Sequence, residues 1–174
     1  LRLILVPRHR ERFDSVAKLV RDAGVELVRR STLESLADRP SGAVILLDTI
    51  GELSACWGLA DIAFVGGSFG NRGGQNMIEP AAFGAAVLFG PNTRNFRDVV
   101  QAFKEADACL QLQEPEELSP TLARLLSDQA ERNFLGAAAQ NTVMTQAGAT
   151  ARTATLLAEV LNSPLIDRDS RTRA

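Results

Sequence analysis

The sequence predicts an α/β fold: a Rossmann-like, doubly wound sheet of six parallel strands with helices on both faces. Short apolar segments alternate with segments of helical periodicity from Leu3 to Leu112. Each apolar segment is hydrophobic on both of its faces, which is typical of parallel strands covered by helices on two sides. The sequence contains no internal repeat and no low-complexity linker, so we expect a single domain.

Strands and helices are expected in alternation. The first strand, residues 3–6, ends at Pro7, and the helix after it, residues 10–23, is closed by Gly24, a residue favoured just beyond a helix C-terminus. Further strands are expected at residues 25–28, 43–47, 62–65, 86–89 and 108–112, and further helices at residues 51–60, 77–83 and 96–105.

Only helices are expected after the sixth strand. Residues 115–128 form one helical segment, and residues 129–161 form a long alanine-rich one that is interrupted near Gly148. The polar residues 162–174 lack this periodicity, and we expect a disordered tail there. The domain is therefore predicted to span residues 1–161.

The composition excludes several classes of function. The 174 residues include 19 Lys+Arg and 21 Asp+Glu, and the resulting net charge of −2 argues against a nucleic-acid-binding protein. One histidine, His9, and two distant cysteines, Cys56 and Cys109, are too few for a disulfide scaffold or a His- or Cys-rich metal site. We therefore expect no bound metal.

The ends and the hydropathy of the chain give two further expectations. No apolar run of about 18 residues and no signal peptide is present, so we expect a soluble chain. The sequence opens with Leu1, without an initiating methionine, inside an apparent buried strand. We therefore expect a domain excised from a longer protein.

Glycine and polar residues follow several of the strands directly. In an open parallel sheet, ligands bind beyond the carboxyl ends of the strands. The loops at these ends, which are expected to converge on one site, comprise residues 7–9, 48–52, 66–68 and 90–92.

The stretch richest in such residues is FVGGSFGNRGGQNMIEPAAFG, residues 64–84. Gly66 and Gly67 allow the backbone to approach a ligand closely, and Asn76 and Glu79 share one face at the start of the next helix. The helix N-terminus suits a phosphate, and the carboxylate suits a pair of ribose hydroxyls. The alternative is an ordinary glycine-rich turn in which Glu79 only stabilises the helix N-terminus.

Arg8 follows the first strand and offers a guanidinium for a phosphate. The alternative is a surface arginine that pairs with Glu11 or Asp14, and His9 beside it is expected to bond locally. The chain has no Walker A loop, no GxGxxG at the first turn, and no Ser-His-Asp set. These residues alone predict a nucleotide-binding module whose chemistry is supplied elsewhere.

Residues near the third strand have structural interpretations. Asp48 or Thr49 is expected to cap the helix at 51–60, and Glu52 in its first turn would suit the helix dipole. Ser31 and Glu34 have the spacing of a capping box, which predicts a short helix after Ser31.

Five motifs make the pattern more specific. VPRHRERF (6–13), LDTIGEL (47–53), ADIAFVGGS (60–68), GGQNMIEPAAFG (73–84) and LFGPNTRNF (88–96) occur in this order. Together they closely resemble the C-terminal domain of the bacterial 3-deoxy-D-manno-octulosonic acid (Kdo) transferases, over residues 1–161. Three positions depart from that pattern: Arg10 replaces a proline, Leu47 a glycine and Gln75 a histidine.

The resemblance implies the C-terminal half of a GT-B glycosyltransferase, in which two Rossmann-like domains enclose the active site. The implied reaction is the inverting, metal-independent transfer of Kdo from CMP-Kdo to a lipid A precursor in lipopolysaccharide synthesis, with no cofactor. The N-terminal domain, expected to be absent here, would bind the acceptor, carry the general base, and dock on the cytoplasmic face of the inner membrane. The fragment alone is expected to be inactive.

The residues that the resemblance assigns to the donor lie on the loops already named. Glu79 would bind the ribose hydroxyls, and Ser68 would face the phosphate or sugar. The implied CMP-binding set is Pro7, Arg8, Ile50, Gly51, Glu52, Gly66, Gly67, Ser68, Asn76, Met77, Ile78 and Glu79, with no catalytic residue among them.

Two alternatives stay open at this point. Another GT-B enzyme that uses a UDP-sugar would prefer UMP over CMP. A non-catalytic Rossmann-like module that binds a protein partner would keep its function when Arg8 and Glu79 are replaced.

Overall fold

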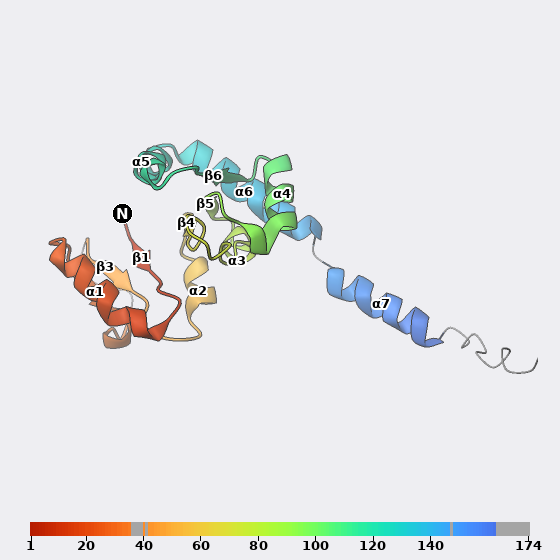
Figure 1. Ribbon diagram of the computed structural model, residues 1–174, viewed down its shortest axis with the longest axis horizontal. Helices are drawn as coiled ribbons and strands as arrows, with labels where there is room; N and C mark the ends of the chain where they lie inside the picture. The colour runs from red at the N-terminus through yellow and green to blue at the C-terminus, as the bar shows by residue number, and fades with distance from the viewer. Residues whose placement is uncertain (36–39, 41, 147, 163–174) are drawn as a thin grey trace, which may run out of the picture.

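The computed structural model describes residues 1–35, 40, 42–146 and 148–162, and Figure 1 shows the arrangement of its elements. Within these residues it has six strands, all paired in parallel, with helices between them, as the sequence predicts. The predicted tail lies outside the described residues, except for Asn162. The strands are β1 (Ile4–Leu5), β2 (Leu27–Arg29), β3 (Val44–Leu46), β4 (Ile62–Val65), β5 (Ala86–Phe89) and β6 (Cys109–Gln111).

The strands form two three-stranded sheets, which corrects the expectation of one six-stranded sheet. Their orders are β1-β3-β2 and β4-β5-β6, so β1 and β4 are both edge strands. The two-residue β1 pairs with β3, where the N–H groups of Ile45 and Leu47 donate to the carbonyls of Leu3 and Leu5 at 2.9 Å. Pro7, just beyond β1, has no N–H. Among the described strands, β1 pairs only with β3, so the two sheets share no ladder.

The helices follow the strands in the predicted order, with shorter bounds. Gly24 (φ +73°) follows α1 as predicted, and Gly148 (φ +94°) separates α6 from α7. Helix α7 extends away from the rest of the molecule (Figure 1). None of the helices in the described ranges is long and apolar enough to cross a membrane. The helices are α1 (Phe13–Asp22), α2 (Leu53–Trp57), α3 (Ile78–Ala82), α4 (Arg97–Glu105), α5 (Leu118–Ser127), α6 (Gln129–Gln146) and α7 (Ala149–Asn162).

The main core surrounds β5, which is buried along its whole length. Val87 and Phe89 pack on one face of the sheet with residues from α3, α4 and α6, such as Phe103. Ala86 and Leu88 pack on the other face with Leu125 of α5 and Leu135 of α6. This sheet therefore has helices on both faces, and the packing fixes α3, which carries part of the predicted site.

Candidate functional site

The loops after β1 and β4 meet through one side-chain hydrogen bond. Arg8 donates from Nη1 to Oε1 of Gln75 at 3.0 Å, and both atoms lie near the surface. The predicted alternative for Arg8, a pair with Glu11 or Asp14, is not found among the described residues: Glu11 lies 3.8 Å from His9, and Asp14 pairs with Arg29. Gln75 occupies the position where the resembled family has histidine, and here its amide oxygen accepts the guanidinium. The structure thus brings the first predicted loop to the glycine-rich loop.

Asn76 and Glu79 lie together at the start of α3. Asn76 donates from Nδ2 to Oε1 of Glu79 at 2.8 Å, and its Oδ1 accepts the Ile78 N–H at 3.0 Å. The Asn76 side chain therefore begins the helix and holds one carboxylate oxygen at the same time. Glu79 is half-buried. Its fixed carboxylate suits the binding of a pair of hydroxyls, because ionised oxygens form strong charge-assisted hydrogen bonds.

The glycine-rich loop is held from the side by a segment that follows β5. Asn92, Arg94 and Asn95 each donate a side-chain hydrogen bond to a carbonyl of the loop. We call residues 92–95 the clamp segment. The bonds run from Asn92 to Gly70 (2.6 Å), from Arg94 to Asn71 (2.6 Å) and from Asn95 to Arg72 (2.9 Å). These consecutive bonds give a surface loop a fixed shape.

The clamp segment was not predicted from the sequence, which pointed only to residues 90–92 beside the site. The signal that could have revealed it is the run of asparagines and arginine in the GPNTRN motif. Gly73 allows the glycine-rich loop to pack closely against the clamp segment. Its φ is +81°, and an added Cβ would lie 2.6 Å from Cγ of Arg94. A side chain at this position would both strain the backbone and displace the clamp segment.

Ser68 is placed differently from the expectation that its side chain faces the donor. Its residue is 0% exposed, and its hydroxyl donates to the Val65 carbonyl at 2.8 Å. The same oxygen accepts the Gly90 N–H at 2.8 Å, which joins the ends of β4 and β5. Since both hydrogen-bonding functions are used inside the fold, the Ser68 side chain stabilises the base of the loop. Gly66 and Gly67, just before it, are partly accessible.

Met77 and Ile78 differ in accessibility. Met77 is 0% exposed and packs in the main core beside Val65. Ile78 is 37% exposed. Of the predicted segment 76–79, the structure therefore presents Asn76, Ile78 and Glu79 at the surface, whereas Met77 anchors the segment.

The turn at residues 50–52 is fixed through Glu52. Arg30 donates from Nη2 to one carboxylate oxygen of Glu52 at 2.8 Å, and the Thr49 hydroxyl donates to the other. The Thr49 hydrogen bond, followed by the Arg30 charge, lowers the pKa of Glu52 despite partial desolvation. Glu52 therefore holds the turn, while Ile50 and Gly51 are exposed at its tip. The turn leads into α2, which packs against α3.

Asp48 lies behind this turn and does not cap a helix. Its carboxylate accepts the Ser31 N–H at 2.9 Å and the Ser31 hydroxyl at 2.7 Å, and Arg29 lies 3.5 Å away. Helix α2 has no side-chain cap, so the predicted roles of Asp48 and Thr49 as caps are wrong. The capping box is wrong too: Ser31 bonds to Asp48 and lies in a 3₁₀ turn, Arg30–Thr32.

The Asp48→Asn variant is expected to be less stable at pH 7 by about 1–2 kcal/mol, because the hydrogen bonds from Ser31 lose their ionised acceptor. Burial raises the pKa of Asp48, but the Ser31 hydrogen bonds and Arg29 outweigh burial and lower it. A lowered folded-state pKa stabilises the fold above about pH 5, and this stabilisation is lost as the pH falls through the folded pKa. Urea unfolding at several pH values measures the difference.

The difference between the two proteins should shrink between about pH 5 and pH 3. Asp61→Asn, which changes an exposed carboxyl, serves as the matched control and should show little effect at any pH. A difference between wild type and Asp48→Asn that stays constant over this range would contradict the assignment.

The remaining candidate residues do not join the site. His9 is exposed, with Nδ1 3.8 Å from Glu11. Burial raises the pKa of Cys56, and raises that of Cys109 to about 11, so both thiols stay protonated near neutral pH. Across the residues that the structure describes, no three His, Cys, Asp or Glu side chains gather as they would to hold a metal ion.

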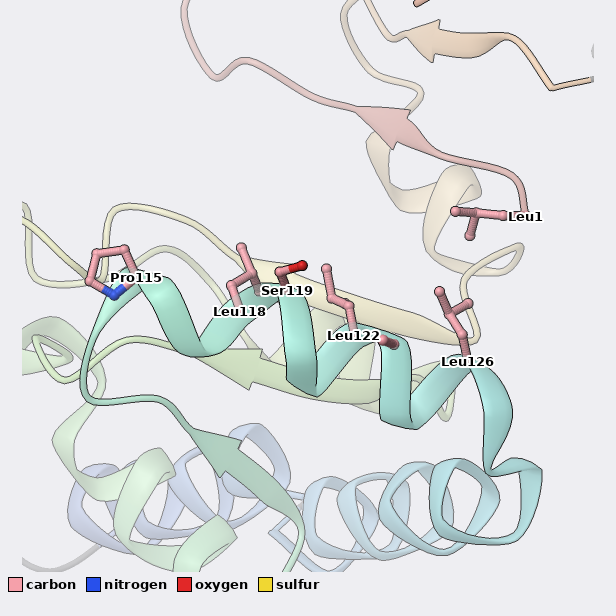
Figure 2. A pocket seen from close by; sticks show the side chains of 7 residues that line it. Leu1, Pro115, Leu118, Ser119, Leu122 and Leu126 are labelled. Atoms are coloured by element: carbon pink, nitrogen blue, oxygen red, sulfur yellow. The ribbon is translucent and has the colours of Figure 1, made fainter.

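A groove of about 470 Å³ lies elsewhere, between Leu1 and α5 (Figure 2). Leu118, Leu122 and Leu126 of α5 line it, together with Pro115, Ser119 and Ala123. It contains no charged side chain and none of the predicted site residues. Its chemistry does not suit a nucleotide, which needs partners for phosphate and hydroxyl groups.

Two comparisons with known proteins find similar proteins. No family model matches the chain. It is 39% identical over 151 residues to the 3-deoxy-D-manno-octulosonic acid transferase of Bordetella pertussis, across 87% of this chain and 35% of that protein. The Haemophilus influenzae enzyme of the same name is 39% identical over 158 residues, across 90% of this chain and 36% of that protein. This chain thus spans about a third of the length of these curated relatives.

A solved structure is also similar. The crystal structure of the C-terminal CMP-Kdo binding domain of WaaA from Acinetobacter baumannii matches with a TM-score of 0.74 and 32% identity. The match covers 80% of this chain and 72% of that one. Sequence and fold therefore agree on the same relatives.

Proposed function

Since this chain belongs to the family of the C-terminal domains of Kdo transferases, we propose that it binds CMP-Kdo as the donor domain of such an enzyme. The observation that carries this proposal is the meeting of the loops after β1 and β4. There, Arg8 contacts Gln75, and the fixed Asn76–Glu79 pair follows directly. This arrangement offers a cation for a phosphate and a carboxylate for ribose hydroxyls.

The proposed roles follow from the chemistry of each group. Glu79 accepts hydrogen bonds from the two ribose hydroxyls, with Asn76 fixing its carboxylate. Arg8, with Pro7 before it, contacts the CMP phosphate. Ile50 and Gly51 contact CMP at the tip of the turn that Glu52 holds. Gly66 and Gly67 let the donor approach the backbone of the β4 loop.

We propose that the whole protein is a GT-B glycosyltransferase that transfers Kdo to a lipid A precursor at the cytoplasmic face of the inner membrane. This chain spans about a third of the length of its relatives, which supports the placement of other functions in the rest of the protein. The rest of the protein would bind the acceptor, dock on the membrane and supply the general base. By itself, this chain would bind donor without turnover.

The proposed transfer exchanges one bond at the sugar. The bond between the anomeric carbon of Kdo and the CMP phosphate oxygen breaks, and CMP leaves with the electron pair. The acceptor hydroxyl oxygen bonds to that carbon from the opposite face, and a carboxylate takes its proton. Arg8 would stabilise the negative charge that develops on the leaving phosphate. No step requires a metal or a cofactor.

A calorimetric titration with CMP and with UMP, each with and without EDTA, tests the proposal. We expect binding of CMP at least about tenfold tighter than UMP, a difference of roughly 1.4 kcal/mol, and no effect of EDTA. Preference for UMP would contradict the Kdo donor and favour a UDP-sugar. Binding of neither nucleotide would contradict a donor site formed by these loops.

A further inference from the structure

The glycine-rich loop carries an arginine, Arg72, that the CMP-binding set does not use. Arg72 is exposed, and no hydrogen bond or ion pair of its guanidinium is found within the described residues. Its backbone, by contrast, is fixed, because its carbonyl accepts a hydrogen bond from Asn95 of the clamp segment at 2.9 Å. The structure therefore holds the base of this side chain in place and leaves its charge available.

Arg72 lies beside the residues that meet Arg8. A Cβ added at Gly67 would lie 3.6 Å from Cβ of Arg72 and 3.6 Å from Cγ of Gln75. Gln75 in turn accepts the Arg8 hydrogen bond at 3.0 Å. Arg8, Gln75, Gly67 and Arg72 are thus successive neighbours at the surface, with an arginine at each end. Gly67 lies between them and has no side chain, so it leaves space for a ligand.

The proposed donor has two acidic groups, which a single arginine does not match. One is the phosphate that links CMP to the sugar, and the other is the carboxylate of the sugar acid. Arg8 is joined through Gln75 to the Asn76–Glu79 pair, which places it toward the nucleotide. Arg72 is separated from that pair along the loop by Gly73, Gly74 and Gln75.

We infer that Arg72 binds the carboxylate of the Kdo sugar while Arg8 binds the phosphate. This inference rests on the proposed function and adds the sugar-acid subsite to it. A guanidinium binds a carboxylate through two parallel hydrogen bonds, so Arg72 would contribute selectivity for an acidic sugar as well as affinity. The clamp segment makes this possible by fixing the loop before the donor arrives.

The experiment compares the affinities of CMP and CMP-Kdo, measured by calorimetry, in wild type and four variants. Arg72→Gln is expected to weaken CMP-Kdo binding about tenfold or more and to change CMP binding less than about twofold. Arg72→Lys keeps the charge without the planar guanidinium, so it should lose less affinity for CMP-Kdo than Arg72→Gln. Arg8→Gln should weaken both ligands. Arg21→Gln, an exposed arginine on α1, is the control and should change neither.

Three results distinguish the possible outcomes. If wild type binds both ligands and Arg72→Gln weakens both equally or neither, the sugar-acid subsite is wrong and the donor site stands. If Arg72→Gln weakens only CMP-Kdo binding, Arg72→Lys loses less of that affinity and Arg21→Gln changes neither ligand, the subsite is supported. If wild type binds neither ligand, the proposed function is wrong, and the sugar-acid subsite that rests on it is wrong too.

Discussion

Replacing Gly136 by alanine is expected to lower the free energy of unfolding by about 3 kcal/mol, near the upper end for overpacking. Gly136 lies in α6 where the helix crosses the turn after α3. A Cβ added there would lie 2.1 Å from the carbonyl oxygen of Gly84. No flexible side chain can yield, because the contact is with backbone. Chemical denaturation of both proteins measures the difference.

The sign of this effect is diagnostic. Glycine in a helix interior is ordinarily destabilising by about 0.5–1 kcal/mol relative to alanine, so without the contact the variant would gain stability. Gly70→Ala is the matched control, because no atom lies within 4 Å of an added Cβ there. Unchanged or increased stability of Gly136→Ala would contradict the packing of α6 on the turn that follows α3.

Glu79→Ala is expected to weaken CMP binding by about 1–3 kcal/mol, or roughly five- to 150-fold, because hydrogen bonds from the ribose hydroxyls to a charged acceptor are lost. Asn76 fixes one oxygen of this carboxylate at 2.8 Å, so wild type holds it ready for the ligand. Glu79→Gln should recover part of the loss, because one carbonyl oxygen remains. Calorimetric titration with CMP measures all three proteins.

The control for Glu79 is another carboxylate held by a side-chain amide. Glu105 accepts a hydrogen bond from Gln101 at 2.7 Å on the exposed side of α4. Glu105→Ala should leave the CMP affinity unchanged. Thermal unfolding of each variant separates a loss of binding from a loss of fold. A folded Glu79→Ala protein with wild-type CMP affinity would contradict the assignment of Glu79 to the ribose.

Local sequence patterns predicted the strands of the second sheet well. The bounds expected for β4 and β5 agree with the structure, because each is a continuous apolar run ended by glycine. Gly24 and Gly148 also fall where the pattern places breaks. These features depend on neighbours along the chain, which is the information that a single sequence carries best.

Features that depend on contacts between distant segments were not predictable in this way. The division into two sheets depends on whether β1 and β4, which lie far apart in the chain, pair with each other. The sequence predicts that Ser68 faces the donor, but its hydroxyl accepts the Gly90 N–H and so joins the end of β4 to the end of β5. The hydrogen bond from Arg30 to Glu52 joins separate segments of the chain, and no local pattern around either residue predicts it.

The glycine at 136 shows the same limit. It lies in an alanine-rich helix, where nothing in the local pattern distinguishes it from its neighbours. Its role appears only once α6 is packed on the turn at Gly84. Close backbone approach is therefore a property of the fold, and its sequence signal is one small residue among many.

The most direct test of the donor site is a map of backbone amide chemical shifts, recorded while CMP is added to the ¹⁵N-labelled chain. We predict that the largest changes fall in three loops: residues 8–9, 50–52 and 75–79. The apolar groove on α5 should stay unchanged. Changes centred on that groove, or spread evenly over the surface, would contradict the claim that the loops after β1, β3 and β4 form one nucleotide site.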